Sequence, residues 1–308
     1  GAAGAYDGRL LGSLDPPSVF PLLAPLGLLP WSAAQMAWLG LNLALVPLLL
    51  TACARVMALP VRAPVTLWFW ALALAWAPLH SGLWLGQTSL LALAAGVVGL
   101  WMLQLERRHL AGLLLGFGIA LKPQLVLPLL MLPLVQHQGR TLVLAGMTAL
   151  VCLGAGILPL ALRQYPWWTD WLANLHDFSA SVEGSTGPEN PTRFNILSLQ
   201  FPLRVLWNDA PAAGAMAALV ALGALAAGSA LAWKRRPSTP GASLTAPPDA
   251  LCLLALSVTA SLLVGYHRIY DALLLLLPLA LCLRAWVQAS RSERWVAGVG
   301  VLVLLVFL

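Results

Sequence analysis

Residues 112–123 read GLLLGFGIALKP, and they place one charged side chain, Lys122, inside an apolar run. The run extends over 110–136 and holds no other charged residue. A segment of this length and apolarity is typical of a membrane, where a charge costs about 2.5–3.5 kcal/mol. A charge kept at that cost usually faces a polar cavity. We therefore predict a glycine-faced helix whose end presents Lys122 to an anion near one membrane face. The alternative is a lysine that snorkels to the interface.

The composition indicates a protein embedded in a lipid bilayer. Hydrophobic residues make up 60% of the chain and charged residues only 9%, far below the charge content of a soluble domain. Basic cytoplasmic loops account for the net charge of +6, so no nucleic-acid partner is expected. The four cysteines lie in apolar segments and show neither a disulfide framework nor metal-ligand spacing. We expect no cofactor, and the need for a divalent metal ion stays open.

Recurring apolar runs predict an all-α, polytopic membrane protein that forms a single domain over 1–308. About ten membrane segments are expected, near 32–54, 66–80, 88–105, 110–122, 123–136, 141–162, 211–233, 250–265, 271–288 and 295–308. The run 110–136 is either two short helices or one span. Two helices put 11 of the 17 lysines and arginines on the cytoplasmic side and 6 elsewhere, whereas one span gives about 8 on each side. We adopt the two helices, with Lys122 at their turn.

This topology assigns each extramembrane segment to a side of the membrane. Residues 1–31, 81–87, 163–210 and 266–270 are expected on the outer face. Within the first of them, 16–30 is apolar but broken by prolines, which favours an interfacial or re-entrant segment. The linker 234–250 is rich in proline, glycine and serine, and it is expected to be cytoplasmic and flexible. The chain starts in a polar segment without methionine and ends in an apolar run, so we expect a fragment lacking an N-terminal span.

The long outer loop 163–210 combines aromatic and polar side chains. It opens with the aromatic residues Tyr165, Trp167, Trp168 and Trp171, and its polar residues include Asn190 and Arg193. Tryptophan and tyrosine are enriched at the headgroup level of membranes, so an aromatic belt is one interpretation. Stacking of the same rings on the apolar faces of sugars is the other.

A second group of polar residues lies between two apolar runs at 265–271. His267 can donate or accept a proton near neutral pH, and Arg268 can bind a phosphate with its guanidinium fork. Asp271 would begin the next helix, where a carboxylate is favourable. The alternatives are an interface anchor for Arg268 and a helix cap for Asp271.

Weaker candidates lie elsewhere on the predicted outer face. His80 and Gln87 flank a short loop that opens a membrane helix, which would place an amide donor within reach of a ligand. His80 is equally consistent with an interfacial histidine that is satisfied locally. Asp7, near the start of the chain, is of the right type for a general base, but no neighbouring residue supports that role.

Taken in order, several strings resemble glycosyltransferase family 87, membrane enzymes of the C-type fold that use lipid-linked sugars. The first string is Asp15-Pro-Pro-Ser-Val-Phe-Pro-Leu-Leu-Ala-Pro-Leu, followed by His80 through Gly86-Gln87. Ala111-Gly112-Leu-Leu-Leu-Gly116 through Lys122-Pro123 comes next, and Tyr266-His267 with Tyr270-Asp271 comes last. The ordered set runs through nearly the whole chain.

The resemblance implies transfer of a hexose, typically mannose, from a polyprenyl-phosphate donor to a glycolipid or glycan acceptor. It implies a bacterial plasma (inner) membrane protein whose active face is periplasmic or extracellular. In such families a carboxylate of the first outer loop is the base, and it usually precedes the Tyr-Asp pair that Tyr6-Asp7 matches. The base is therefore expected upstream of this sequence, with Asp7 as the weaker candidate.

We expect an inverting transfer in which Lys122 and Arg268 stabilise the charge on the departing phosphate. The residues expected to bind the donor phosphate or sugar are Lys122, Arg268, His80, Gln87 and Asp271, with His267 as a catalytic or orienting residue. Trp167, Trp168, Asn190 and Arg193 are expected to face the acceptor or the lipid.

Three other functions remain open from the sequence. A polysaccharide polymerase or ligase would use a diphosphate-linked lipid and need basic residues for the second phosphate. A transporter or flippase would show paired broken helices around a midplane site, whereas the polar residues here gather at one face. A scaffold without catalytic activity would not explain the intramembrane lysine.

Overall fold

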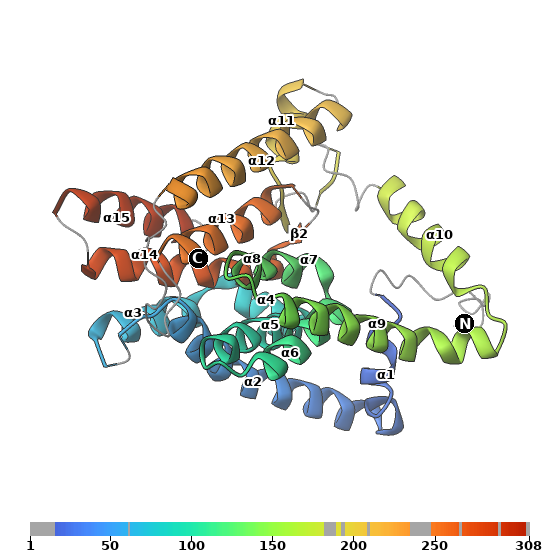
Figure 1. Cartoon of the computed structure of the whole chain (residues 1–308). Coiled ribbons are helices and arrows are strands. Elements are labelled where there is room, and N and C mark those ends of the chain that lie inside the picture. The colour runs from blue at the N-terminus through green and yellow to red at the C-terminus, as the bar shows by residue number, and fades with distance from the viewer. Residues whose placement is uncertain are drawn as a thin grey trace.

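The chain is almost entirely helical in the computed structural model, which describes residues 16–60, 62–181, 189–191, 195–207, 210–234, 248–264, 267–288 and 291–305. The helices before the first strand are α1 (Val19–Leu23), η1 (Leu26–Leu28), α2 (Trp31–Val56), α3 (Pro64–Ala75), α4 (Ala77–Trp84), α5 (Ser89–Gln104), α6 (Arg108–Leu121), α7 (Pro123–Val126), η2 (Leu127–Leu130), α8 (Met131–Val135), α9 (Gly139–Leu162) and α10 (Trp167–Ala180). They are followed by β1 (Ile196–Leu197), α11 (Gln200–Trp207), α12 (Ala210–Lys234), α13 (Pro248–Val264), β2 (His267–Arg268), η4 (Ile269–Leu275), α14 (Leu276–Gln288) and α15 (Arg291–Leu305). The all-α prediction is confirmed (Figure 1).

Helix length distinguishes two classes among the predicted membrane segments. Three helices are long and apolar enough to cross a membrane: Trp31–Val56, Gly139–Leu162 and Ile269–Gln288, the last formed by η4 and α14. Six other predicted segments coincide with shorter apolar helices, and the segment 295–308 coincides with α15 as far as it is described. Length alone therefore supports a polytopic membrane protein without requiring that all ten segments cross.

Two of the expected boundaries are wrong. The segment 66–80 is not one helix, because the chain becomes extended at Trp76, with φ −79° and ψ 125°, and starts again as α4 with Pro78 in its first turn. Proline has no backbone N–H and is tolerated in the first turn, so Pro78 suits a new helix rather than a continuing one. The stretch 163–210, expected as a loop, contains α10 and α11.

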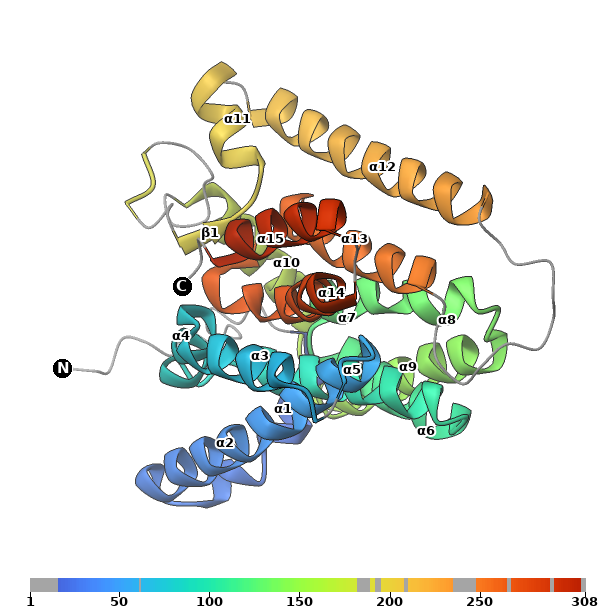
Figure 2. The ribbon, with the colours of Figure 1, turned by 90° about the vertical axis from the view of Figure 1, so that its left-hand side faces the viewer.

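The run 110–136 breaks at Lys122, as the two-helix interpretation predicts. Lys122 ends α6 and precedes α7 with φ −145° and ψ 86°, outside helical geometry. Pro123 explains the break, since the residue before a proline is disfavoured in the helical region. After the break, α7, η2 and α8 run back in the direction opposite to α6 (Figure 2).

Glycines let α6 pack closely on its two neighbours, α5 and α9. A Cβ at Gly112 would lie 2.9 Å from the Leu144 Cβ of α9, and one at Gly116 would lie 2.6 Å from the Thr148 Cβ. A Cβ at Gly118 would lie 2.8 Å from the backbone oxygen of Ala92 in α5. Small residues four apart commonly allow such close helix contacts in membranes. The glycine-faced helix expected from 112–123 is therefore confirmed, with α9 against one side and α5 against another.

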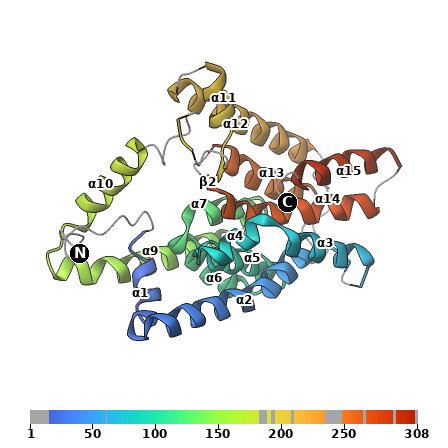
Figure 3. The same cartoon turned by 180° about the vertical axis from the view of Figure 1, so that it is seen from behind.

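The helix ends separate into two sides. The last turns of α2, α5, α12 and α14 lie toward the left of Figure 1, whereas α10 lies at its right edge. From behind, α1 lies beside α9, on the side of the molecule that also carries α10 (Figure 3). The site described next is built on the helix break at Lys122 and on the segments packed around it.

Candidate functional site

Lys122 is buried in the protein instead of extending to the surface. Only 4% of the residue is exposed, and its Nζ donates to the Ser89 Oγ at 2.7 Å. The Asp271 Oδ1 lies 3.5 Å from the same nitrogen, and the Tyr270 ring centroid lies at 4.8 Å. An ammonium has three N–H donors and also interacts favourably with an aromatic face. The snorkelling alternative for Lys122 is therefore wrong, because the side chain reaches a polar cluster inside the fold.

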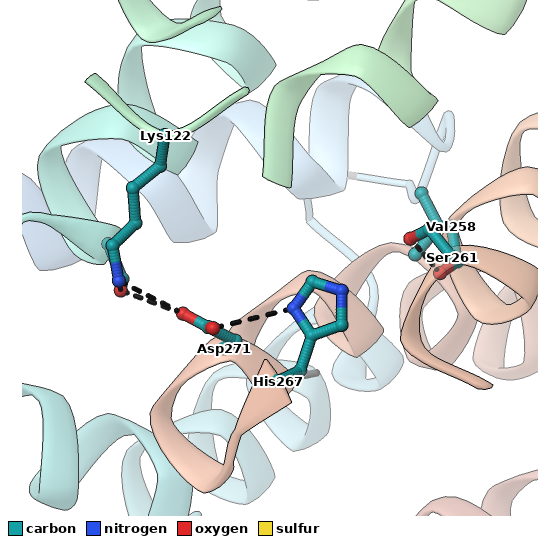
Figure 4. A network of polar contacts seen from close by, with 6 residues as sticks. Lys122, Val258, Ser261, His267 and Asp271 are labelled. Carbon is teal, nitrogen blue, oxygen red and sulfur yellow. Dashed lines mark hydrogen bonds and ion pairs between the residues drawn. The ribbon is translucent and has the colours of Figure 1, made fainter. Parts of the chain in front are cut away.

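Asp271 lies at the centre of this cluster (Figure 4). Its Oδ1 accepts a hydrogen bond from the Ser89 hydroxyl at 2.8 Å, and its Oδ2 lies 3.4 Å from the His267 Nδ1. Asp271 and His267 are 3% and 2% exposed. We call Ser89, Lys122, His267 and Asp271 the buried polar cluster. The cap alternative for Asp271 is not supported, since its side chain contacts these three residues.

Three separate parts of the chain supply the cluster. Ser89 opens α5, Lys122 occupies the break after α6, and Asp271 lies in the first turn of η4, a short distance after His267 in β2. Packing of α4 against η4 holds the last part in place, and a Cβ added at Gly82 would lie in ordinary contact, 3.7 Å from the Tyr270 Cβ. The site therefore depends on tertiary packing rather than on one local motif.

The stretch 195–200 is attached to the same region through a two-stranded antiparallel sheet. β1 pairs with β2 in the register Ile196 to Arg268 and Leu197 to His267. Beyond the strands, the Gln200 Nε2 donates to the Val264 backbone oxygen at 2.7 Å. Adjacent side chains of a strand point to opposite faces. Because His267 points toward Asp271, its neighbour Arg268 is directed to the other face of the strand and does not join the cluster.

Charge in the cluster is largely balanced. Lys122 and Asp271 carry opposite charges, and a buried charge is tolerated only when it is paired and hydrogen-bonded. The 3.5 Å contact between them is longer than the 2.7–2.9 Å typical of a strong charge-assisted hydrogen bond. Ser89 compensates, because its hydroxyl accepts from the lysine and donates to the carboxylate. The ammonium is thus held in place without a tight direct ion pair.

The N-terminal part of the described chain approaches Lys122 from another direction. The Ser18 hydroxyl donates to the backbone oxygen of Ala120, two residues before Lys122. Pro17 lies against Gly156 of α9, where a Cβ would collide with the proline backbone. Pro17 and Ser18 are therefore buried in the helical bundle. Asp7, the weak candidate for the base, lies outside the described residues.

Other predicted site residues do not join the cluster. His80 is exposed in α4, where its Nε2 lies 2.7 Å from the Leu74 backbone oxygen, in agreement with local satisfaction. Gln87 is half-buried in the turn before α5. Trp167 and Trp168 contact each other edge to face in α10, with ring centroids 5.5 Å apart, and this helix stands away from the cluster (Figure 1). Asn190 is buried, and Arg193 lies outside the described residues.

Sequence reasoning missed two members of the site. Ser89 was not singled out, although it follows Gln87 by two residues at the start of an apolar helix. Tyr270 belongs to one of the family-like strings, but nothing in the sequence indicates that its ring lies over the lysine ammonium. A serine in an apolar helix is common, so only its contacts distinguish it. Within the described part of the chain, no three histidine, cysteine, aspartate or glutamate side chains are grouped as metal ligands.

Comparison with known proteins places the chain in a family. No curated protein and no solved structure matches it. The sequence model of glycosyltransferase family 87 matches residues 14–264, well over half of the chain. The match includes Ser89 and Lys122 and ends just before His267 and Asp271. Together with the helical, apolar architecture, it identifies this membrane protein as a member of glycosyltransferase family 87.

Proposed function

We propose that the chain transfers a hexose, in the first instance mannose, from a polyprenyl-phosphate donor to a glycolipid or glycan acceptor. The transfer would occur on the periplasmic or extracellular face of a bacterial inner membrane. The observation that carries this proposal is the buried Lys122 ammonium at a helix break, within reach of Ser89, Asp271 and Tyr270. Family membership supports a membrane glycosyltransferase, and the cluster is the reason to choose a phosphate-linked donor.

Lys122 has the chemistry that a departing phosphate requires. When the sugar leaves, negative charge builds up on the phosphate oxygens, and a preorganised cation stabilises that charge most effectively where water is excluded. Lys122 is buried and already oriented by Ser89, so little reorganisation is needed at the moment of reaction. The loose contact with Asp271 leaves the ammonium able to donate a hydrogen bond to a phosphate oxygen.

His267 is the second candidate for contact with the donor. Its Nδ1 faces the Asp271 Oδ2, which orients the ring and leaves the Nε2 as the nitrogen that would serve a ligand. Arg268 points to the other face of β2, so we assign it to the rim of the site, where it would attract the anionic donor before the phosphate reaches Lys122. This revises the expectation that Lys122 and Arg268 together stabilise the charge on the departing phosphate.

The base that activates the acceptor is proposed to lie outside the cluster. Both oxygens of Asp271 are already engaged inside the cluster, by Ser89, Lys122 and His267, so neither is free to meet an acceptor hydroxyl. A carboxylate of the first outer loop, or Asp7 if that loop supplies none, remains the proposed base for an inverting transfer. No metal ion takes part in this scheme.

The proposal is tested with the full-length parent protein in membranes and radiolabelled polyprenyl-phosphate-mannose. Lys122→Ala is expected to lower transfer by about 10²–10³-fold, the usual cost of removing one preorganised electrostatic contact. Lys234→Ala, which changes the other lysine of the chain, should keep the wild-type rate. Assays with Mg²⁺ and with EDTA establish whether a metal ion is needed.

Two results would count against this scheme. Full transfer by both Lys122→Ala and Arg268→Ala would remove the proposed phosphate site. Transfer only from a diphosphate-linked sugar would instead favour a polymerase or ligase.

A further inference from the structure

An apolar groove of about 410 Å³ lies beside the turn that leads into α5. Its walls come from η1, from the first two turns of α2 and from that turn; they include Leu26, Gly27, Trp31, Gln35, Trp38 and Gly86. No charged side chain lines it, and Gln35 is the one lining residue with a polar side-chain amide. A groove of this composition suits a hydrocarbon chain and would not hold a phosphate.

The surroundings of the groove are also apolar. Leu28 and Trp31 are 87% and 77% exposed, so large hydrophobic side chains border the groove and face outward. Such exposure is ordinary where the surroundings are lipid rather than water. The groove follows α2 over residues 31–38, about 10 Å of helix, starting from the end that the topology assigns to the outer face. An amphiphile in the outer leaflet would meet it from the side.

Both walls of the groove are tied to the buried polar cluster. The Trp38 Nε1 donates to the Gly86 backbone oxygen at 2.8 Å, which fixes α2 to the turn, and Gly86 adopts a left-handed φ of +60° that glycine tolerates. Ser89 follows Gly86 by three positions, so the groove wall lies at most about 11 Å along the chain from the serine that holds Lys122. On the other wall, residues 16–29 are anchored to Ala120 through Ser18.

A larger apolar groove, of about 630 Å³, is a poorer match for the same ligand. It is lined by residues of α3, α14 and α15, including Trp68, Trp286 and Trp295. Its nearest lining residue on α14, Leu283, follows Asp271 by twelve residues, about 18 Å of helix. This groove therefore lies toward the opposite ends of the helices, too far from Lys122 for the first isoprene units of a phosphate-bound lipid.

We propose that the groove between η1, α2 and Gly86 binds the isoprenoid chain of the donor while the phosphate lies at the buried polar cluster. This inference rests on the proposed function and adds the place of the lipid. Apolar burial along the groove would then contribute to donor affinity, and the turn from Gly86 to Ser89 would join the two parts of the site.

The test fills the groove at Gly27. A Cβ at Gly27 meets no atom within 4 Å, so Gly27→Trp adds a ring to the groove without a backbone collision. Gly40→Trp is the matched control, because Gly40 on α2 is equally open but does not line the groove. With a long polyprenyl-phosphate-mannose, Gly27→Trp should raise the donor KM by about tenfold or more with kcat retained. With a donor of only two isoprene units, the KM should not change, and Gly40→Trp should alter neither value.

A direct binding measurement accompanies the kinetics. Polyprenyl phosphate carrying a photoreactive group on its second isoprene unit should label the peptide that contains residues 23–38, and Gly27→Trp should reduce that labelling. Ala34→Phe provides a second filled groove if Gly27→Trp is poorly folded by size-exclusion chromatography.

The possible outcomes separate the groove from the proposed function. An unchanged KM for the long donor in both filled variants would overturn the groove assignment, as would an increase in the acceptor KM alone. A wild-type protein that transfers no sugar from any polyprenyl phosphate would contradict the proposed function instead. Even then, photolabelling of a peptide other than the one that contains residues 23–38 would contradict the assignment of the lipid chain to the groove.

Discussion

Lys122 and Asp271 each lose hydration when they are buried, and their mutual attraction recovers only part of that loss. Replacing such a pair by well-packed apolar residues is often neutral or even stabilising, so a buried pair is weak evidence of a stabilising role. The pair here is also loose at 3.5 Å and depends on Ser89 to join its members. These features favour retention of the pair for ligand binding rather than for stability.

This argument predicts opposite outcomes for stability and activity. Asp271→Asn leaves the Lys122 charge without a partner and should destabilise the protein by about 3–5 kcal/mol. The double variant Lys122→Met, Asp271→Leu removes both charges and should recover most of that stability, yet it should remain inactive. Denaturant unfolding in detergent and the mannose-transfer assay measure the two quantities.

Recovery of activity in the double variant would show that the pair is only structural. A double variant as unstable as Asp271→Asn would show instead that the pair contributes to folding.

The sequence identifies some residues in and around the buried polar cluster better than others. Lys122, His267 and Asp271 are conspicuous because ionisable residues are rare in apolar runs, and each was singled out for that reason. Ser89 and Tyr270 are not rare in such runs, and their roles follow only from contacts between distant parts of the chain. Arg268 was grouped with His267 because they are neighbours, but strand geometry separates their directions.

At the scale of elements, apolar runs locate the helices well but do not show where they break. Lys122-Pro123 was recognised as a break because a charge and a proline coincide there. The break at Trp76 was missed, since its only signal is Pro78 inside a uniformly apolar stretch. The helix α10 was missed for the opposite reason: tryptophans and polar residues obscured a helical pattern at 167–180. The burial of Pro17 and Ser18 against α9 has no sequence signal beyond the prolines.

The contact between α9 and the N-terminal stretch gives a prediction at this scale. Gly156→Val would force Pro17 away from α9 and, with it, the Ser18 hydroxyl from Ala120. Overpacking of this kind costs about 1–3 kcal/mol. Because Ala120 lies beside Lys122, transfer activity should also fall. Denaturant unfolding and the transfer assay measure both effects.

Gly154→Val is the control within the same helix. A Cβ at Gly154 meets no atom within 4 Å, so the change should alter stability by less than about 0.5 kcal/mol. If Gly154→Val lowered stability as much as Gly156→Val, valine itself would disturb α9. The contact of Pro17 and Ser18 with Gly156 would then not be the cause.

For the whole molecule, the distribution of charge decides which side faces the cytoplasm. Arginines and lysines cluster at the ends of α2, α5, α12 and α14 and at the starts of α6, α9 and α15. Those ends lie on the side of the molecule opposite α10 (Figure 1). The positive-inside rule therefore predicts that α10 and its tryptophans lie outside. In this predicted orientation the groove at residues 23–38 would lie in the outer leaflet, where a donor for an external reaction must lie.

Cysteine labelling in whole cells tests this orientation. The four native cysteines are first replaced by alanine, and single cysteines are then introduced as His176→Cys in α10 or Gln288→Cys at the end of α14. Both positions are exposed, so each thiol is free to react. A membrane-impermeant maleimide should label His176→Cys in intact cells and Gln288→Cys only after permeabilisation. The reverse pattern would place the groove in the cytoplasmic leaflet, and the donor would then have to be supplied from the cytoplasmic side, which would contradict the proposed external transfer.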